Sequence, residues 1–171
     1  VTFLPLLAAL LVAMMPAKAH KAIRWFALLA TTVVFLVSLR LVGAFQANPD
    51  MQMVVHKPWL PSLGISYHMG IDGISLFLVM LVTFLTFITV LGSFSNIETR
   101  VKEFFVCMLL LETAMIGAFV ALDLFLFYVF WEAMLIPMYF MIGMWGGERK
   151  IYATVKFFIY TMIGSLLMLI A

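Results

Sequence analysis

The sequence has little charge and almost no cysteine. Only 11% of its 171 residues are charged, whereas 66% are hydrophobic. A soluble domain of this length has no use for such a composition, and apolar runs near 20 residues indicate an integral membrane protein. The single cysteine, Cys107, excludes an internal disulfide and every metal motif built from several cysteines. We expect Cys107 to be a small core residue of a helix.

Several chemical motifs are also missing. The sequence contains no Gly-rich phosphate loop, no nucleophile elbow, no paired His–Cys ligands and no basic patch for nucleic acid. Its three histidines, His20, His56 and His68, lie outside the long apolar runs, which argues against a haem held within the membrane. His56 and His68 are twelve residues apart with no third ligand nearby, so we expect no metal site. The chemistry that remains is the movement of ions or protons.

Six apolar stretches follow one another along the chain. About 20 apolar residues rising ~1.5 Å each cross the ~30 Å hydrocarbon core of a bilayer. The pattern predicts an all-α polytopic transmembrane helix bundle forming one domain over 1–171, with spans at about 1–15, 23–45, 73–95, 104–122, 124–145 and 151–171. Pro16 is expected to stop the first span. The stretch 46–70 is predicted to be an interfacial loop, with a short hairpin or surface helix. The chain begins without Met and ends in apolar sequence, so we interpret it as part of a longer protein.

The basic residues predict the orientation. Three linkers, those after the first, third and fifth spans, hold seven of them, whereas the other two connections hold only Lys57. The seven are Lys18, Lys21, Arg24, Arg100, Lys102, Arg149 and Lys150. Basic residues collect on the cytoplasmic side, so the N-terminus and the 46–70 loop are expected outside.

The stretch from Leu124 to Trp145, LFLFYVFWEAMLIPMYFMIGMW, is the strongest functional candidate. Its only carboxyl group, Glu132, lies near the middle of the span, where an ionisable group costs about 2.5–3.5 kcal/mol. Pro137 has no N–H to donate, so the carbonyl of Ala133 loses its helical partner. A carboxyl group beside a freed carbonyl can hold water. The alternative is a neutral Glu132 that only packs.

Two further residues are candidates for a proton relay. Counted from the turn at Asp123, Glu112 and Glu132 lie at depths of ~16 and ~14 Å on adjacent antiparallel spans, where they can share or exchange a proton. Burial favours the neutral form of each group and a nearby cation favours the charged form. Small residues lie opposite Glu112, which places the fourth span inside the bundle. Lys156 either joins the relay or extends to the interface.

The third predicted span carries a polar stripe. At 100° per residue, six side chains fall within about a third of its circumference: Asp72, Ser75, Thr83, Thr86, Thr89 and Ser93. These groups either bond to neighbouring helices and to their own backbone, which we favour, or line a proton path.

Long segments resemble a known family. GISYHMGIDGISLFLVMLVTFL (64–85), ALDLFLFYVFWEAMLIPMYFMIGMWGG (121–147) and KFFIYTMIGSLLMLIA (156–171) resemble the antiporter-like membrane subunits of proton-translocating NADH–quinone oxidoreductase, respiratory complex I. Chain M, called subunit 4 in mitochondria, is the best match, and WEAMLIPMYF is its most specific part. The family has fourteen transmembrane helices that start on the outside, so the six predicted spans correspond to its N-terminal part.

The resemblance implies a non-redox, proton-pumping subunit of the translocase. The family's fifth-helix glutamate falls on Glu132, and its partner is a lysine on a seventh helix that lies outside this chain; Lys156 is not that lysine. FMN, iron–sulfur clusters and quinone are expected in other subunits. The implied partners are neighbouring antiporter-like subunits and the lipid bilayer, with no nucleic acid. The implied membrane is the bacterial inner membrane, with the mitochondrial inner membrane as the alternative. Two alternatives come from related complexes: a subunit of a multi-subunit Na⁺/H⁺ antiporter, and the equivalent chain of a ferredoxin-dependent photosynthetic relative of complex I. A third alternative is a purely structural membrane subunit.

Overall fold

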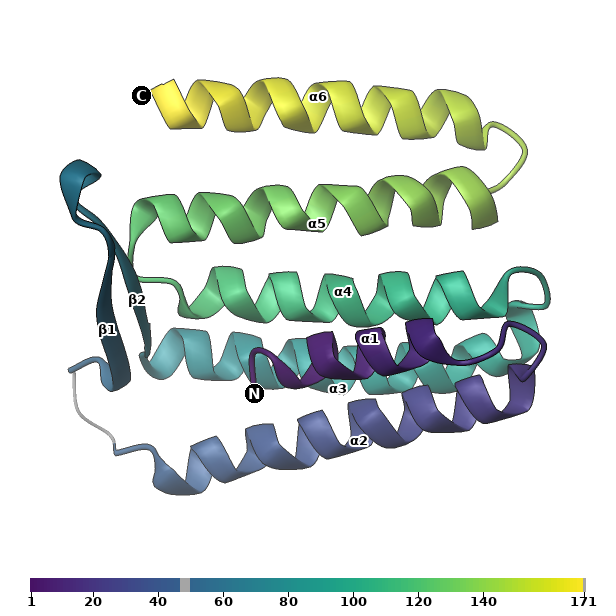
Figure 1. The fold of residues 1–171 in the computed structure, drawn as a ribbon, viewed down its shortest axis with the longest axis horizontal. Coiled ribbons are helices and arrows are strands. Elements are labelled where there is room, and N and C mark those ends of the chain that lie inside the picture. Colours follow the sequence, from purple (N-terminus) through teal and green to yellow (C-terminus); the bar gives the residue numbers. More distant parts are fainter. Residues whose placement is uncertain (47–49, 171) are drawn as a thin grey trace.

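A computed structural model describes residues 1–46 and 50–170. Residues 47–49, with Pro49 of the predicted loop, and Ala171, the end of the sixth predicted span, lie outside the described residues. Antiparallel helices run back and forth, with a β-hairpin at one end (Figure 1). The elements are α1 (Leu4–Met14), α2 (His20–Ala44), β1 (Gln52–Leu60), β2 (Ile65–Ile71), α3 (Gly73–Asn96), α4 (Val101–Val120), α5 (Leu124–Trp145) and α6 (Lys150–Ile170).

The helices confirm the predicted polytopic bundle. Each helix boundary lies within three residues of the predicted span. Five helices, α2 to α6, are long and apolar enough to cross a membrane, whereas α1 has 11 residues. Helix α1 ends before Pro16 because a residue that precedes proline prefers extended backbone, and Met15 has φ −70° and ψ 147°.

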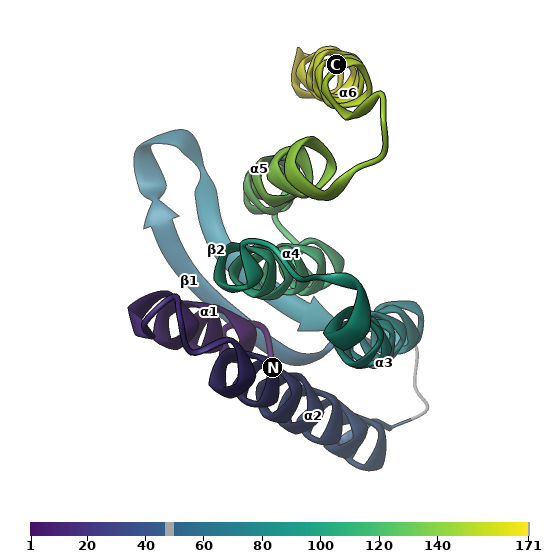
Figure 2. The ribbon, with the colours of Figure 1, turned by 90° about the vertical axis from the view of Figure 1, so that its right-hand side faces the viewer.

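Helix α4 is the packing centre of the bundle. It packs against α1, α2, α3 and α5 (Figure 2), and 61% of its most apolar window is buried, compared with at most 33% in the other spans. The prediction that this span lies inside a bundle is confirmed. Helices α5 and α6 extend from α4 in a row, and α6 packs mainly on α5.

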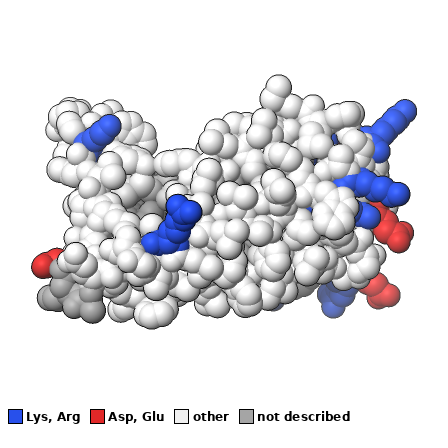
Figure 3. Space-filling model, turned by 90° about the horizontal axis from the view of Figure 1, so that it is seen from below, with Lys and Arg blue, Asp and Glu red and all other residues white. Residues whose placement is uncertain are grey.

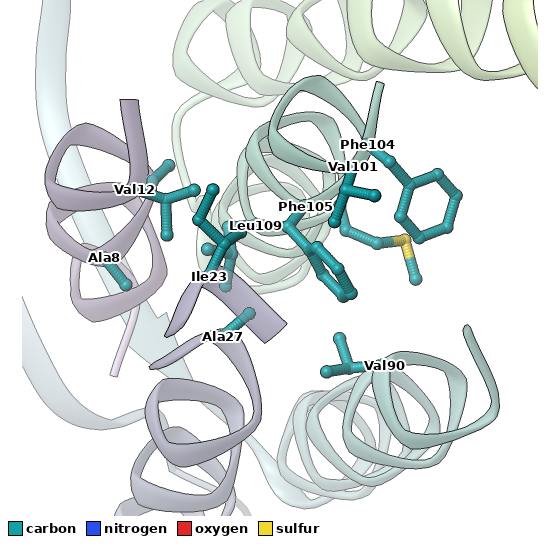
Figure 4. Packing of buried hydrophobic residues seen from close by; sticks show 11 residues of the cluster. Ala8, Val12, Ile23, Ala27, Val90, Val101, Phe104, Phe105 and Leu109 are labelled. Atoms are coloured by element: carbon teal, nitrogen blue, oxygen red, sulfur yellow. The ribbon is translucent and has the colours of Figure 1, made fainter. Parts of the chain in front are cut away.

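Two apolar clusters fill the bundle. We call one end of the molecule the linker end, because the α1–α2, α3–α4 and α5–α6 connections lie there, and the other the hairpin end. The linker-end cluster (Figure 4) consists of Ala8, Ala9, Val12, Ile23, Ala27, Val90, Val101, Phe104, Phe105, Met108 and Leu109. The hairpin-end cluster consists of Val34, Met69, Ile71, Leu76, Val79, Val82, Ile116, Val120 and Leu126.

Residues 52–71 form a β-hairpin, one of the two structures predicted for the loop between the second and third spans. Strands β1 and β2 pair antiparallel and are joined by a 3₁₀ turn, Pro61–Leu63, and by Gly64 at φ 69°. The hairpin also binds the α4–α5 turn, because Met69 pairs with Ala121 and the Leu122 amide donates to the His68 carbonyl over 2.9 Å. A short β element therefore adds to the helical fold.

Charged side chains gather at the linker end (Figure 3). Here Arg24 donates to the Ile97 carbonyl over 2.7 Å, joining the start of α2 to the end of α3. The Trp145 indole donates to the Thr99 carbonyl over 3.0 Å, so α5 is tied to the same surface. The positive-inside rule therefore predicts that the linker end faces the cytoplasm.

Candidate functional site

Glu132 lies in the middle of α5 and is only half buried. Its Oε1 atom is buried and has no hydrogen-bond partner among the described residues. Helix α5 begins at Asp123, which accepts from the amides of Phe125 and Leu126 over 3.0 and 3.2 Å, and it continues through the buried Pro137. A capped start and a rigid apolar segment therefore fix the depth of this carboxyl group.

Tyr128 and Ser165 lie beside Glu132. The Tyr128 hydroxyl lies near the Glu132 carboxyl, one helical turn along α5, and near the Ser165 hydroxyl of α6. Ser165 is 3% exposed and donates to the Met162 carbonyl over 3.1 Å. These three groups form a small polar cluster between α5 and α6. Tyr128 lies in the predicted site segment, but Ser165 was missed because only the antiparallel packing of α5 on α6 brings it there.

Glu112 is fully buried, and neither of its carboxyl oxygens has a hydrogen-bond partner among the described residues. At 100° per residue, Phe105, Leu109 and Ile116 lie within about 60° of Glu112 on the α4 surface. These neighbours belong to the two apolar clusters, so Glu112 is directed towards the α1–α3 side of α4.

Glu112 also lies where the two apolar clusters meet. Along α4, the linker-end cluster ends at Leu109 and the hairpin-end cluster begins at Ile116. Polar residues occupy the middle of neighbouring helices, and several are almost fully buried: Thr31, Ser38, Thr83, Thr86 and Thr113. A buried polar layer therefore crosses the bundle at mid-depth.

The hydroxyl stripe of α3 contributes to this layer through structural hydrogen bonds. Thr83 and Ser38 hydroxyls lie 2.9 Å apart and join α3 to α2. Thr86 and Ser93 donate to carbonyls of their own helix over 2.9 and 2.6 Å. The stripe thus makes the helix–helix and backbone bonds that we favoured, and Asp72 caps α3 by accepting from the Ser75 amide over 2.7 Å.

The structure does not bring Glu112 and Glu132 together. Gly117 of α4 lies directly against the Phe130 ring of α5, so these two residues mark the facing surfaces of the helices. Glu112 is about 140° from Gly117, and Glu132 is about 160° from Phe130. The two carboxyl groups share a depth but lie on opposite sides of the α4–α5 interface.

Lys156 also lies away from Glu132. It is exposed, and its ammonium group lies 5.7 Å from the centre of the Tyr152 ring. Nine residues separate it from Ser165, which places the two on opposite faces of α6. Within the described residues, no group of three or more His, Cys, Asp and Glu side chains is placed to hold a metal ion.

The fold and these residues define the class of the protein. It is a polytopic helical membrane protein with ionisable groups inside its bundle. Residues 121–171 match the family model for the transmembrane part of NADH:quinone oxidoreductase and Mrp antiporters.

The relatives identify the particular family. The chain is 52% identical to NADH-quinone oxidoreductase subunit M of Rhodobacter capsulatus over 177 aligned residues, covering 100% of this chain and 34% of the relative. It is 42% identical to NADH-ubiquinone oxidoreductase chain 4 of Chondrus crispus, covering 98% of this chain and 34% of that protein. We therefore assign the chain to the family of NADH-quinone oxidoreductase subunit M and chain 4, as its N-terminal part.

A solved structure agrees with this assignment. A chain of respiratory complex I from Thermus thermophilus with bound NADH superposes with a TM-score of 0.83 at 32% identity, covering 98% of this chain and 33% of that one. The chain thus spans about a third of the length of the proteins it matches.

Proposed function

We propose that this chain is part of a membrane-arm subunit of NADH-quinone oxidoreductase and contributes to proton translocation coupled to electron transfer from NADH to quinone. The observation that carries the proposal is Glu132, an ionisable group at mid-depth in α5 with a buried oxygen that has no hydrogen-bond partner among the described residues. A buried carboxyl group prefers the neutral form, and an approaching cation favours the charged form. In this proposal Glu132 carries the transferred proton, and a cation from outside this chain controls its release.

The other polar groups support this role in different ways. Tyr128 places a hydroxyl beside the Glu132 carboxyl, and Ser165 lies next to Tyr128 at the α5–α6 contact. Glu112 is a second protonatable group on the α1–α3 side of α4, so a proton moving between the carboxyl groups must pass around that helix. Lys156 remains a relay candidate only with a partner from outside the described residues, on the other face of α6.

The chain itself performs no redox step in this proposal. FMN, iron–sulfur clusters and quinone belong to other subunits, and neighbouring antiporter-like subunits and the lipid bilayer are the partners. The membrane is the bacterial inner membrane, as the bacterial relatives suggest.

Glu132→Gln in the full-length protein tests the proposal. Glutamine keeps the size and polarity of the side chain but cannot carry a proton. Inside-out membrane vesicles would be assayed for NADH-driven, inhibitor-sensitive quinone reduction and for acidification of the lumen. We expect the complex to assemble and both signals to fall by at least about tenfold, equivalent to ~1.4 kcal/mol.

The matched control is Glu103→Gln, which removes an exposed carboxyl group at the linker end of α4. It should leave both signals unchanged. Wild-type signals from Glu132→Gln would show that the carboxyl group only packs. If the variant fails to assemble, Glu132→Asp separates the cases, because a protonatable group should restore pumping in part.

A sodium-transporting antiporter is the competing function, because the matching family model also covers Mrp antiporters. NADH-dependent acidification that persists in sodium-free buffer supports the proposal. Sodium-dependent transport without NADH oxidation would support the antiporter.

A further inference from the structure

Two histidines become neighbours in the hairpin. The antiparallel register places His56 of β1 opposite His68 of β2. Their ring centres lie 4.7 Å apart, with the rings inclined at 61°. The twelve-residue spacing gave no sign of this contact, because it depends on how the two strands pair.

The pair lies on the face of the hairpin that is turned away from the hairpin-end cluster. Side chains alternate along a strand, so His68 is on the face opposite Tyr67 and Met69. Met69 is buried in the hairpin-end cluster, so the histidine face is turned away from that cluster. The α4–α5 turn reaches part of the histidine face, where the Ser66 hydroxyl bonds to Asp123 and Leu122 lies against Gly70. His56 is exposed and His68 is half buried, so an ion can reach both rings from water.

We infer that His56 and His68 form a binding site for a divalent transition-metal ion of the zinc class. Neutral imidazole nitrogen is a preferred ligand of Zn²⁺, at a distance of ~2.0–2.1 Å. Two adjacent rings on paired strands can bind one ion between them. Water fills the remaining positions, because no third protein ligand lies among the described residues. The site is therefore exchangeable and differs from a four-ligand structural zinc site.

Metal binding at this position would clamp the hairpin. Strand β1 is exposed along almost its whole length, whereas β2 is held by the α4–α5 turn through Ser66 and Asp123. An ion shared by the two strands adds a link between the exposed strand and the anchored one.

The first experiment measures Zn²⁺ bound to the purified intact complex that contains the full-length protein. Equilibrium dialysis against Zn²⁺ alone, followed by elemental analysis, would compare wild type with His56→Asn, His68→Asn and the double variant. We expect each variant, including the double one, to bind one Zn²⁺ fewer than wild type. The matched control is His20→Asn, an exposed histidine at the linker end, which should bind as much as wild type.

Two results would overturn the inference. If both single variants bind as much Zn²⁺ as wild type, the pair is not a site. If the double variant loses two Zn²⁺ ions where each single variant loses one, each histidine binds an ion of its own and the two do not share one. A second measurement needs no variant: Zn²⁺ should protect both histidines of the wild-type complex from diethylpyrocarbonate, as mapped by mass spectrometry. Equal modification with and without Zn²⁺ would also refute the site. Neither readout depends on proton pumping, so the outcome is independent of the proposed function.

Discussion

At the scale of single residues, Glu112 is the most unusual side chain in the bundle. It is fully buried, and both of its oxygens lack partners among the described residues. Burying an unpartnered polar group costs roughly 1–3 kcal/mol even when it is neutral. A residue that served only to fill space would be replaced by an apolar one at no loss, so Glu112 invites a direct test.

We predict that Glu112→Leu separates packing from proton transfer. Leucine removes the cost of the buried carboxyl group, so the purified complex should unfold at the same temperature as wild type or higher. Proton pumping should nevertheless fall several-fold, because leucine cannot carry a proton. Thermal unfolding and vesicle acidification measure the two effects.

Met108→Leu is the matched control, since it changes a buried apolar residue one turn away on the same helix. Volume-conserving apolar changes of this kind usually cost less than about 1.5 kcal/mol. If the Glu112→Leu variant pumps protons as fast as wild type, Glu112 has only a packing role.

The sequence predicts some features of the candidate site and not others. Glu132 stands out because it is the only carboxyl group in 22 almost continuously apolar residues. The proximity of Ser165 to Tyr128 is not visible, because it depends on the register between two antiparallel helices. The directions of Glu112 and Glu132 are not visible either, because equal depth does not determine which faces of two helices meet. Equal depth alone led us to expect that the two carboxyl groups exchange a proton, but they are not in direct contact.

At the scale of elements, Asp123 joins two of them, β2 and α5. Its carboxyl group accepts from the amide and hydroxyl of Ser66 in β2, over 2.9 and 3.0 Å, and caps the first turn of α5. The Ser66 amide, followed by the Leu126 amide and the Ser66 hydroxyl, holds the pKa of Asp123 below its usual range. The hairpin is thereby fixed to the helix that carries Glu132.

We predict that this junction is sensitive to acid. Because the folded state lowers the pKa of Asp123, its stabilisation is complete above the unfolded value of about 3.9 and is lost as the pH falls below that value. Hydrogen exchange in β2 and the first turn of α5, corrected for intrinsic rates, should therefore be constant from pH 7 to 5 and faster below about 4.

Two substitutions test this assignment. Asp123→Ala removes the cap and should weaken the junction by about 0.5–2 kcal/mol at neutral pH. Asp123→Asn keeps a capping oxygen without an acidic proton, so it should retain most of the protection and lose the change near pH 4. The same change near pH 4 in the Asn variant would place the acid-sensitive group elsewhere.

At the scale of the whole molecule, hydropathy predicts the spans but not the packing centre. The stretch 124–145 is the most conspicuous in sequence, yet α4 is the helix that the others surround. The length of an apolar stretch indicates that a helix lies in the membrane, but it does not show whether the neighbours of that helix are lipid or other helices. The small residues of α4 did indicate close helix neighbours, and Gly117 shows why they are needed.

We predict that Gly117→Leu separates α5 from the rest of the bundle. Even a single added carbon at this position would overlap the Phe130 ring, so a leucine must push the helices apart. The variant should reduce the amount of assembled complex and lower its unfolding temperature. Gly92→Leu is the control, because nothing lies within 4 Å of a carbon added there. Equal loss in both variants would show a general intolerance to leucine at membrane depth.

The final prediction concerns the orientation of the whole chain. With seven basic residues in the three connections at the linker end or in the first turns of the helices that follow them, that end should face the cytoplasm and the hairpin the outside. Ser62 in the hairpin turn and Ser95 near the end of α3 are both exposed and make a matched pair for cysteine substitution. A membrane-impermeant maleimide should label Ser62→Cys in right-side-out vesicles and Ser95→Cys only in inside-out vesicles. Cys107 is buried and should stay unlabelled in both, which gives an internal control. The reverse pattern would invert the topology, and with it the side from which Zn²⁺ reaches the two hairpin histidines.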